Sequence, residues 1–378
     1  AVPCTQCGGY GPPWLFGTGS VVRVTSEGLE TVATLTTPTG VAFDSSGNMY
    51  VSSMITGLVY RYSAEEPAVR ADVGAAYVFH GGAGLAASQS ADNADVILAG
   101  EVSGDRFGCS AGVGDYDGDG QADLFVGASR ANPVMPNGLI DDGAVFLWLG
   151  PVSDSQTYQA ADAHYALLGD DEGAMGASIA VGDVNGDGLD DLVVSAPDAD
   201  SEVAYAAGLV LIFYGDAVVY SESADNADVL LHGATARGDF GAGLLVADLS
   251  GDGVMDILAT APDESAGAER NGQAYLFSGG PVLGDTWALA ADVVLTGRAR
   301  DYEHFGESAG AVDRDSDGVL DLCVSASGSD LEPSSSGSVH LFSGDGGLAA
   351  DSDADAAALS IAGEPGDGHF GGSLSSGE

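Results

Sequence analysis

The sequence predicts an all-β protein, a β-propeller built from four-stranded antiparallel blades. Two observations predict it: an acidic loop occurs four times, and short apolar strands recur with it at the same spacing. The loops open at 115, 183, 248 and 313, so one repeat is 65 to 68 residues long. No helix-length apolar pattern lies between the strands. Four short strands cannot bury both of their faces alone, whereas copies stacked in a ring can.

The acidic loops cover residues 115–123, 183–191, 248–256 and 313–321. Each has oxygen-bearing side chains at its first, third, fifth and ninth places and glycine at its sixth. Ca²⁺ takes six to eight oxygen ligands, and glycine permits the sharp bend that brings them together. An EF-hand loop closes with a Glu at its twelfth place. Here the closing carboxylate is the ninth residue and apolar strand formers follow at once, so we expect each loop at the tip of a β-hairpin.

Acidic, glycine-rich loops are also common as solvated turns. A single copy would be weak evidence for an ion, but four copies at regular intervals favour ion binding.

Two further markers recur with the loops. A glycine leads an alternating aromatic strand at 74–79, 143–148, 208–213, 272–277 and 337–342. A Phe-Gly pair begins at Phe107, Phe240, Phe305 and Phe370, with Met175-Gly176 in its place once. Together the markers predict complete blades over roughly 107–169, 175–233, 240–297 and 305–363.

Phe-Gly, the acidic loop and a Gly-Ala-Pro-like turn such as Ser195-Ala-Pro197 together resemble FG-GAP repeats, as in the propeller of integrin α subunits. The resemblance covers about residues 72–378. It implies that each loop joins the two innermost strands of a blade and binds Ca²⁺, about four ions in all. The implied side-chain ligands are Asp115, Asp117, Asp119 and Asp123; Asp183, Asn185, Asp187 and Asp191; Asp248, Ser250, Asp252 and Asp256; Asp313, Asp315, Asp317 and Asp321. The implied backbone carbonyl ligands belong to Gln121, Leu189, Val254 and Val319.

Residues 16–71 differ from the rest and resemble an NHL-type propeller repeat, through Pro38-Thr-Gly-Val-Ala-Phe-Asp44 and Gly47-Asn-Met-Tyr-Val51. We therefore expect three parts: an irregular Cys/Gly/Pro-rich segment at 1–15, the NHL-like segment at 16–71 and the FG-GAP repeats at 72–378. Residues 74–100 supply the outer two strands of a further blade. Its inner pair is missing or comes from the NHL-like segment, and residues 370–377 are a candidate closing strand.

The full ring is expected to hold six or seven blades, of which this chain is a part. A fifth acidic loop would open at Glu378, the last of the 378 residues, and neither an initiator Met nor a signal peptide is present. Among the four cysteines, Cys4 and Cys7 form a C-x-x-C without a second pair, which favours a local disulfide or a remnant over zinc. Cys109 and Cys323 are expected to be buried thiols.

The formal net charge is −47, and all ten basic residues are arginine. This charge argues against nucleic acid and anionic membranes as partners, and no apolar run reaches the length of a membrane span. High Asp content without Lys suits a secreted, calcium-rich or saline setting, but GC-rich coding equally favours Ala, Gly, Asp and Arg over Lys.

The leading functional hypothesis is a calcium-stabilised, extracellular binding or adhesion module without catalytic residues. Its protein or glycan ligand is unknown, and the candidate binding loops are 130–142, 198–207, 263–271 and 328–336. The alternative is an accessory propeller of a larger secreted enzyme. Arg237-Gly-Asp239 forms an RGD tripeptide, but Asp239 belongs to the Phe-Gly element, which favours coincidence. Trp148 and Tyr275 alternate along strands, which favours core packing over sugar stacking.

Overall fold

In the computed structural model the chain forms β-strands, turns and short 3₁₀ helices, and the residues that it describes include no α-helix. None of the helical turns in this described part has the length or apolar character of a membrane-spanning helix. The prediction of an all-β fold is confirmed. The structure describes strand residues at 18–25, 28–36, 38–43 and 49–53, and residues 73–374 apart from 80–90, 92–93, 133–141, 153–155, 170–172, 202–203, 217–222, 282, 329–336, 345–347, 349–351 and 364–369.

The strands of the described residues form one two-stranded hairpin and five larger sheets. The hairpin pairs β1 (Thr18–Thr25) with β2 (Gly28–Thr36). The first two larger sheets contain β3 (Pro38–Phe43), β4 (Met49–Ser53), β5 (Ala75–Phe79), β6 (Val96–Ala99) and β10 (Gln156–Gln159), and then β7 (Phe107–Gly114), β8 (Asp123–Ala128), β9 (Ala144–Trp148) and β11 (Tyr165–Leu168).

The remaining three sheets come from the later repeats. The first contains β12 (Ile179–Gly182), β13 (Asp191–Ala196), β14 (Leu209–Phe213), β15 (Val229–His232) and β19 (Thr286–Trp287). The second contains β16 (Leu244–Ala247), β17 (Asp256–Ala261), β18 (Gln273–Phe277), β20 (Val293–Thr296) and β24 (Ser352–Asp353). The third contains β21 (Phe305–Val312), β22 (Asp321–Ala326), β23 (Ser338–Phe342) and β25 (Leu359–Ala362).

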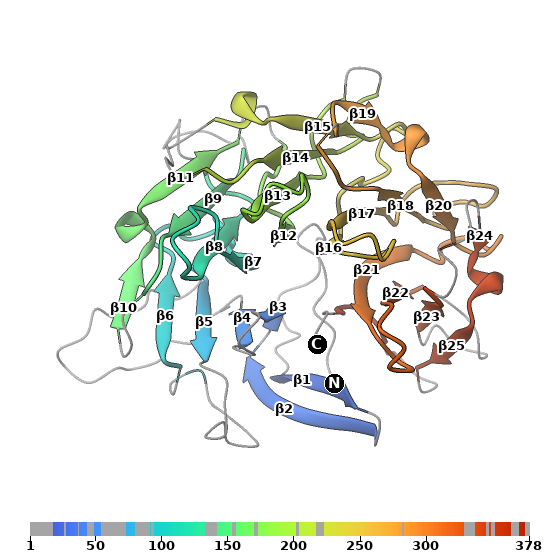
Figure 1. Ribbon diagram of the computed structural model, residues 1–378, viewed down its shortest axis with the longest axis horizontal. Coiled ribbons are helices and arrows are strands. Elements are labelled where there is room, and N and C mark those ends of the chain that lie inside the picture. Colours follow the sequence, from blue (N-terminus) through green and yellow to red (C-terminus); the bar gives the residue numbers. More distant parts are fainter. Residues whose placement is uncertain are drawn as a thin grey trace.

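The five larger sheets are arranged like the blades of a propeller around a common centre (Figure 1). In each sheet the first strand of the repeat is the innermost, and consecutive inner strands contact one another from β3 through β7, β12 and β16 to β21. The next three strands of each repeat follow outward by antiparallel pairing. The predicted blades therefore correspond to the observed sheets.

The sheet nearest the N-terminus combines strands from both parts of the chain. β4 pairs with β5 from Met49↔Phe79 to Ser53↔Ala75, so the NHL-like segment supplies the inner pair, one of the two alternatives open from the sequence. The suggested pairing of residues 370–377 with this sheet is not observed for 370–374, and residues 375–377 lie outside the described part of the chain. Residues 370–374 form no strand, and the Leu374 amide donates to Ser308 Oγ (2.8 Å) at the sheet of β21.

Two of the recurring sequence markers meet at each boundary between repeats. Gly272, which leads β18, has φ +81°, and a Cβ at this position would lie 2.0 Å from the carbonyl oxygen of Phe305 in the next repeat. The same approach recurs between Gly208 and Phe240, where the Cβ would lie at 2.2 Å. Only glycine tolerates both this backbone conformation and this contact. The Phe-Gly element of one repeat is therefore seated against the third strand of the repeat before it.

A second contact between repeats lies at the outer edge. β10, β19 and β24 each pair in parallel with the outermost strand of the preceding repeat, which is β6, β15 or β20. These edge strands lead directly into 3₁₀ helices of three residues, at Ala160–Asp162, Ala288–Ala290 and Ala354–Ala356. Each of these repeats thus adds a strand to its predecessor's sheet before it forms the outer strand of its own.

The core consists of side chains shared between neighbouring sheets. Leu258, Phe305 and Leu322 belong to one buried cluster although they come from two blades. Trp148 and Tyr275 have no exposed surface, as core packing requires. Cys109 is buried, and its Sγ lies 3.2 Å from the Gly176 carbonyl oxygen, whereas Cys323 is only partly buried. Cys4 and Cys7 lie outside the described residues.

We expect Phe240→Ala to lower the free energy of unfolding by about 3–5 kcal/mol, because truncation of a buried aromatic side chain loses its transfer energy and leaves a cavity. Phe240 is 1% exposed and packs edge-on against Tyr275, with ring centroids 5.7 Å apart. Tyr205→Ala is the matched control: this ring is 65% exposed, and its loss should change stability by less than about 0.5 kcal/mol. Urea denaturation measures both values. Equal losses would contradict the packing described here.

Candidate metal centres

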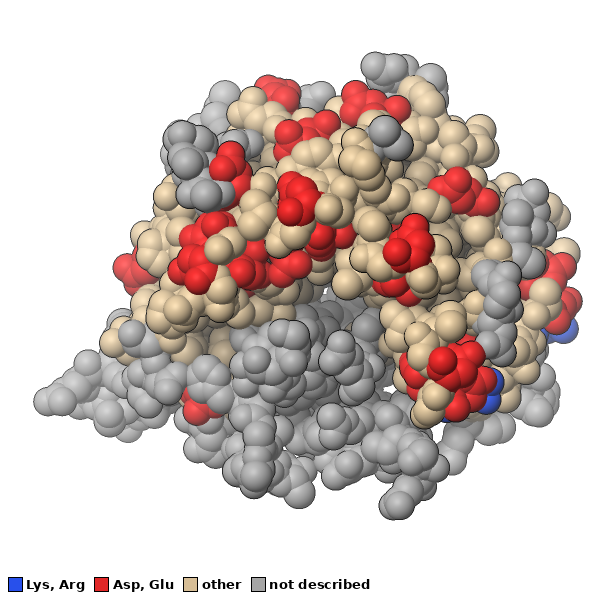
Figure 2. Space-filling view, viewed as in Figure 1, with Lys and Arg blue, Asp and Glu red and all other residues tan. Residues whose placement is uncertain are grey.

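The four acidic loops connect the two innermost strands of four consecutive blades, as predicted. They join β7 to β8, β12 to β13, β16 to β17 and β21 to β22. Acidic side chains form separate patches on the face of the molecule viewed in Figure 2. Because antiparallel strands alternate in direction, the connections from the second to the third strand of each blade lie at the opposite end of the sheets.

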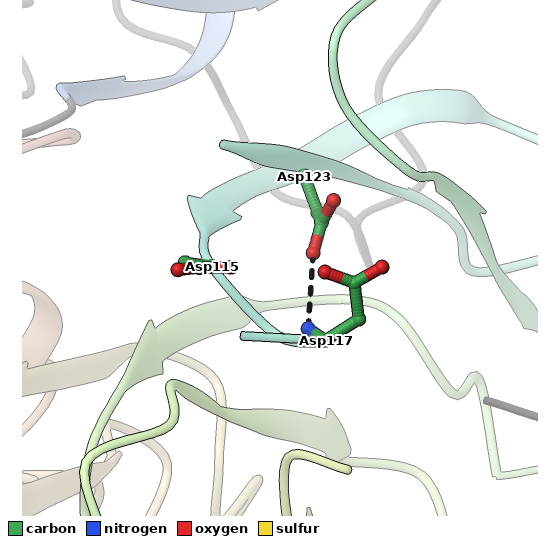
Figure 3. Close-up of side chains that lie close together, drawn as sticks. All are labelled: Asp115, Asp117 and Asp123. Carbon is green, nitrogen blue, oxygen red and sulfur yellow. Dashed lines mark hydrogen bonds between the residues drawn. The ribbon is translucent and has the colours of Figure 1, made fainter. Parts of the chain in front are cut away.

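In the first loop the structure brings three of the predicted ligands together. Asp115, Asp117 and Asp123 each place a carboxylate oxygen within 4.8 Å of the others (Figure 3). Asp119 is at the exposed side of the loop, where its Oδ1 accepts the Gln121 amide (2.8 Å). In the fourth loop the clustered set is Asp313, Asp315 and Asp317, which hold the first, third and fifth places in contrast to the first, third and ninth places of the first loop.

The first-place aspartate organises the turn of each loop. In the second loop, Asp183 Oδ1 accepts the amides of Gly186 (2.7 Å) and Asp187 (3.0 Å), and Oδ2 accepts the amide of Gly188 (2.8 Å). Asp248 makes the same three contacts in the third loop, at 2.7 to 3.1 Å. These bonds turn the backbone around the first-place carboxylate. Among the described residues, groups of three clustered carboxylates occur in the first and fourth loops, and not in the second and third.

The ninth-place aspartate joins the loop to the rest of the blade. Asp191 Oδ2 accepts the amides of Val184 (2.9 Å) and Asn185 (3.2 Å), while Oδ1 accepts the amide of Gly215 (2.9 Å), which follows the third strand. The same arrangement holds for Asp123 with Gly150 and for Asp256 with Gly279. All four ninth-place aspartates are at most 3% exposed.

Burial makes the ninth-place carboxylates of the first three loops costly to ionise. It raises the pKa of Asp123 to about 6, against the backbone hydrogen bonds from Gly150 and Tyr116 that lower it. Burial likewise raises the pKa of Asp191 to about 6 and that of Asp256 in the same direction. A cation beside such a carboxylate favours its charged form. The loops therefore present the electrostatic environment in which a bound cation is most stabilising.

The donor set fits a hard cation. Asp115 Oδ1 is buried and has no hydrogen-bond partner, although it lies within a cluster of carboxylates. The seventh-place amides of Gln121, Leu189, Val254 and Val319 each donate to the fifth-place aspartate of their loop. All donor atoms offered by these loops are oxygens, the ligand type that Ca²⁺ prefers. The sixth-place glycines have the positive φ that was expected, from +84° at Gly120 to +95° at Gly188.

The fourth loop differs from the others in two ways that the motif alone did not reveal. Its fourth place is Ser316 at φ +62°, where the other loops have glycine. Its second place is Arg314, whose Nη2 and Nε lie 3.4 Å from Asp315 Oδ2 and Asp321 Oδ2. The guanidinium thus already neutralises two of the predicted ligands. An arginine inside an acidic loop was the sequence signal for this difference.

The RGD tripeptide is not displayed as an exposed loop tip. Arg237 lies over the ring of Tyr205, 5.7 Å from its centroid, and Gly238 is buried. Burial, together with the negative charges of Asp263 and Asp198, raises the pKa of Asp239 to about 7. The aspartate is part of the packing between repeats, in line with the interpretation from its position in the Phe-Gly element.

The pair Ser338 and His340 has the residue types of a catalytic dyad but the surroundings of a core contact. His340 Nε2 lies 2.8 Å from Ser338 Oγ, and Nδ1 lies 2.9 Å from Ser360 Oγ. Neither Ser338 nor His340 has exposed surface, and burial lowers the pKa of His340 to about 4. The imidazole is therefore neutral at physiological pH and satisfied by two hydroxyl groups.

Comparison with known sequences agrees with this geometry. Residues 107–148, 175–213 and 240–277 match the FG-GAP repeat family. Human phosphatidylinositol-glycan-specific phospholipase D is 31% identical over 225 residues, 57% of this chain and 26% of that protein. Integrin alpha-PS2 of Drosophila melanogaster is 31% identical over 195 residues, 49% of this chain and 13% of that protein. Human integrin alpha-IIb is 34% identical over 233 residues, 59% of this chain and 20% of that protein.

The chain thus spans about a quarter or less of the length of these relatives. Among solved structures, Bacillus licheniformis rhamnogalacturonan lyase aligns with 81% of this chain and 65% of its own, at 14% identity and a TM-score of 0.36, too low to support an argument. The assignment of the repeats is supported by the sequence matches together with the loop geometry. Three segments of this chain therefore match FG-GAP repeats, and about half of the chain is similar to integrin α subunits.

Proposed function

We propose that this chain is a calcium-stabilised binding or adhesion module of an extracellular or cell-surface protein, and not itself a catalyst. The observation that supports the proposal is the set of four acidic loops at the inner hairpins of consecutive blades, two of which bring three carboxylates together. Two integrin α subunits are 31% and 34% identical to this chain over the matched residues, and this similarity supports a role in adhesion.

Calcium would have a structural role here. In each loop the side chains at the first, third, fifth and ninth places and the carbonyl of the seventh would hold one ion, four in all. Such an ion supplies positive charge to carboxylates that otherwise repel one another. Catalytic metal sites keep a position open for substrate, whereas the proposed ligands would fill the usual coordination places with protein oxygens. Extracellular calcium modules typically bind with Kd of about 10⁻⁴ to 10⁻³ M.

The ligand would bind to the rim opposite the acidic loops. The candidate loops 198–207 and 263–271 lie there, while much of 130–142 and nearly all of 328–336 lies outside the described residues. Tyr205 and Tyr302 are 65% and 48% exposed on this rim. Exposed tyrosines are characteristic of binding surfaces because they combine a large apolar area with a hydrogen-bonding group.

The second candidate function is an accessory propeller of a larger enzyme. Human and rat phosphatidylinositol-glycan-specific phospholipase D match 57% and 54% of this chain, and the matched part is 26% and 24% of those proteins. The two candidates differ in what accompanies the propeller. A catalytic domain in the full reading frame would favour the enzyme-associated role.

Removal of calcium should lower the melting temperature by about 10 °C or more, because four ions with Kd near 10⁻⁴ M each contribute about 1.4 kcal/mol at 1 mM free calcium. Thermal unfolding by circular dichroism, in 1 mM CaCl₂ and in EDTA, measures the difference. Magnesium at the same concentration is the control, and it should restore little stability because Mg²⁺ requires stricter octahedral geometry. An unchanged melting temperature in EDTA would refute the calcium proposal.

The third loop should bind calcium most weakly, because Ser250 replaces the carboxylate or amide found at the third place of the other loops. Ser250→Asp should tighten this site by about fivefold or more, since it adds a charged ligand. Ser250→Asn, which copies Asn185 of the second loop, separates ligand geometry from charge. Calorimetric titration of each variant reads the change. A third site that fills first, or as tightly as the others, would contradict this ranking.

Ligand binding should require the rim opposite the acidic loops. We expect a screen against arrayed glycans and purified extracellular proteins to identify binding that Tyr205→Ala combined with Tyr302→Ala weakens at least tenfold, the scale of one binding hot spot. Leu289→Ala is the control, because Leu289 is 77% exposed on the outer edge of a blade. Binding that survives the double substitution, or that Leu289→Ala removes, would place the ligand elsewhere.

A further inference from the structure

Asp190, at the eighth place of the second acidic loop, is hydrogen-bonded to the first acidic loop. Its Oδ2 accepts the backbone amide of Asp115 at 2.7 Å, and its own amide donates to the Asp115 carbonyl at 3.2 Å. Both backbone polar groups of Asp115, the first ligand of the first loop, are thus held by a residue of the second loop.

The surrounding packing is built around this contact. A Cβ on Gly114 would lie 2.7 Å from Asp190 Oδ2 and 2.4 Å from Val181 Cγ1, so only glycine leaves room for the carboxylate. A Cβ on Gly118 would lie 2.6 Å from Leu189 Cδ2. The first loop therefore rests directly on residues 189–190 of the second.

The side-chain part of this contact is specific to the first boundary. At the next boundary the backbone bond recurs, from the Met255 amide to the Asp183 carbonyl at 3.2 Å. The thioether of Met255 is a weak acceptor and carries no charge. The eighth places of the first and fourth loops are Ala122 and Leu320, which offer no acceptor either.

Asp190 also stands between two predicted ligands of its own loop, the Leu189 carbonyl and the Asp191 carboxylate. Any event that fixes residues 189–191 therefore fixes the acceptor that orients the Asp115 peptide. The Asp115 side chain is also partly fixed within its own loop. Its Oδ2 accepts the Gly120 amide at 3.0 Å, while its buried Oδ1 has no partner.

We propose that Asp190 is a positioning residue that couples the first and second loops, so that an ion in the second raises the affinity of the first. This inference rests on the proposed calcium binding. By linkage the effect is reciprocal, because a coupling free energy acts equally on both sites. The contribution of Asp190 divides into a hydrogen bond to Asp115 and a negative charge near both loops, and Asn in its place retains only the hydrogen bond.

Terbium luminescence can test the coupling, because Tyr116 lies within the first loop and can excite an ion bound there. The luminescence that Asp119→Ala removes belongs to the first loop. Its terbium affinity is measured with and without Asp187→Ala, which disables the second loop. In the otherwise unchanged protein we expect Asp187→Ala to weaken the first loop by about tenfold, within the usual range of coupling between sites.

The same pair of measurements in the Asp190→Ala background completes a double-mutant cycle. The first loop should already be weak there, and Asp187→Ala should weaken it no further. Asp190→Asn should retain most of the coupling. Asp190→Met copies the residue of the third loop and serves as a second variant if Asp190→Ala folds poorly. Met255→Ala is the control and should leave the first loop unchanged.

The inference is overturned if Asp187→Ala leaves the first loop unaffected, or if the loss is the same with and without Asp190. Circular dichroism at saturating calcium verifies that each variant is folded. If the unchanged protein binds neither terbium nor calcium, the calcium proposal fails and the coupling fails with it. If it binds both ions without coupling, only the role of Asp190 is wrong.

Discussion

The arrangement of each blade depends on the hydrogen bonds of one buried group, the carboxylate at the ninth place of the acidic loop. One of its oxygens accepts amides of the loop, and the other accepts the amide that follows the third strand. A single side chain thus determines the curvature of the hairpin tip and its distance from the strand beside it. Because the group is buried, its charge is expensive without a compensating cation or several hydrogen bonds. The fold and the predicted ion sites are therefore consequences of the same residue.

Contacts between repeats also depend on a few residue types that recur at these boundaries. The Phe-Gly element fills the space beside the glycine of the preceding third strand, and the inner strands pack in succession. The phenylalanine ring packs against aromatic side chains in the third strand of its own repeat, as Phe240 does against Tyr275. Its backbone instead meets the glycine that leads the third strand of the preceding repeat, as Phe240 meets Gly208. The two markers therefore recur together, because each boundary between repeats needs both.

Much of this organisation was predictable from the sequence, because it depends on residue types with few alternative roles. Positive φ at Gly120 and Gly188 follows from the sharp turn, and the hairpin follows from strand formers on both sides of the loop. The contact between Gly208 and Phe240 was not predictable, since pairing two markers requires knowledge of which repeat edges meet. Likewise, the parallel strands β10, β19 and β24 are too short to have a recognisable pattern.

The side-chain details of the loops were the hardest to foresee. A motif specifies the ligand positions and leaves the intervening ones open, so it does not predict the roles of Asp190 and Arg314. Their effects arise from the direction in which each side chain leaves the backbone. Asp190 reaches the neighbouring loop, whereas Arg314 folds back onto the carboxylates of its own.

The parallel edge strands affect how the protein unfolds. A repeat that contributes β19 or β24 is a component of two sheets at once, its own and its predecessor's. Unfolding of such a repeat would remove the edge strand from the sheet of the preceding repeat and leave the backbone of β15 or β20 unpaired. Repeats joined in this way lose the independence of simple stacked arrays, whose units can fray one after another from the ends. Local opening is consequently shared across neighbours, and the cooperative unit is larger than the repeat that the sequence displays.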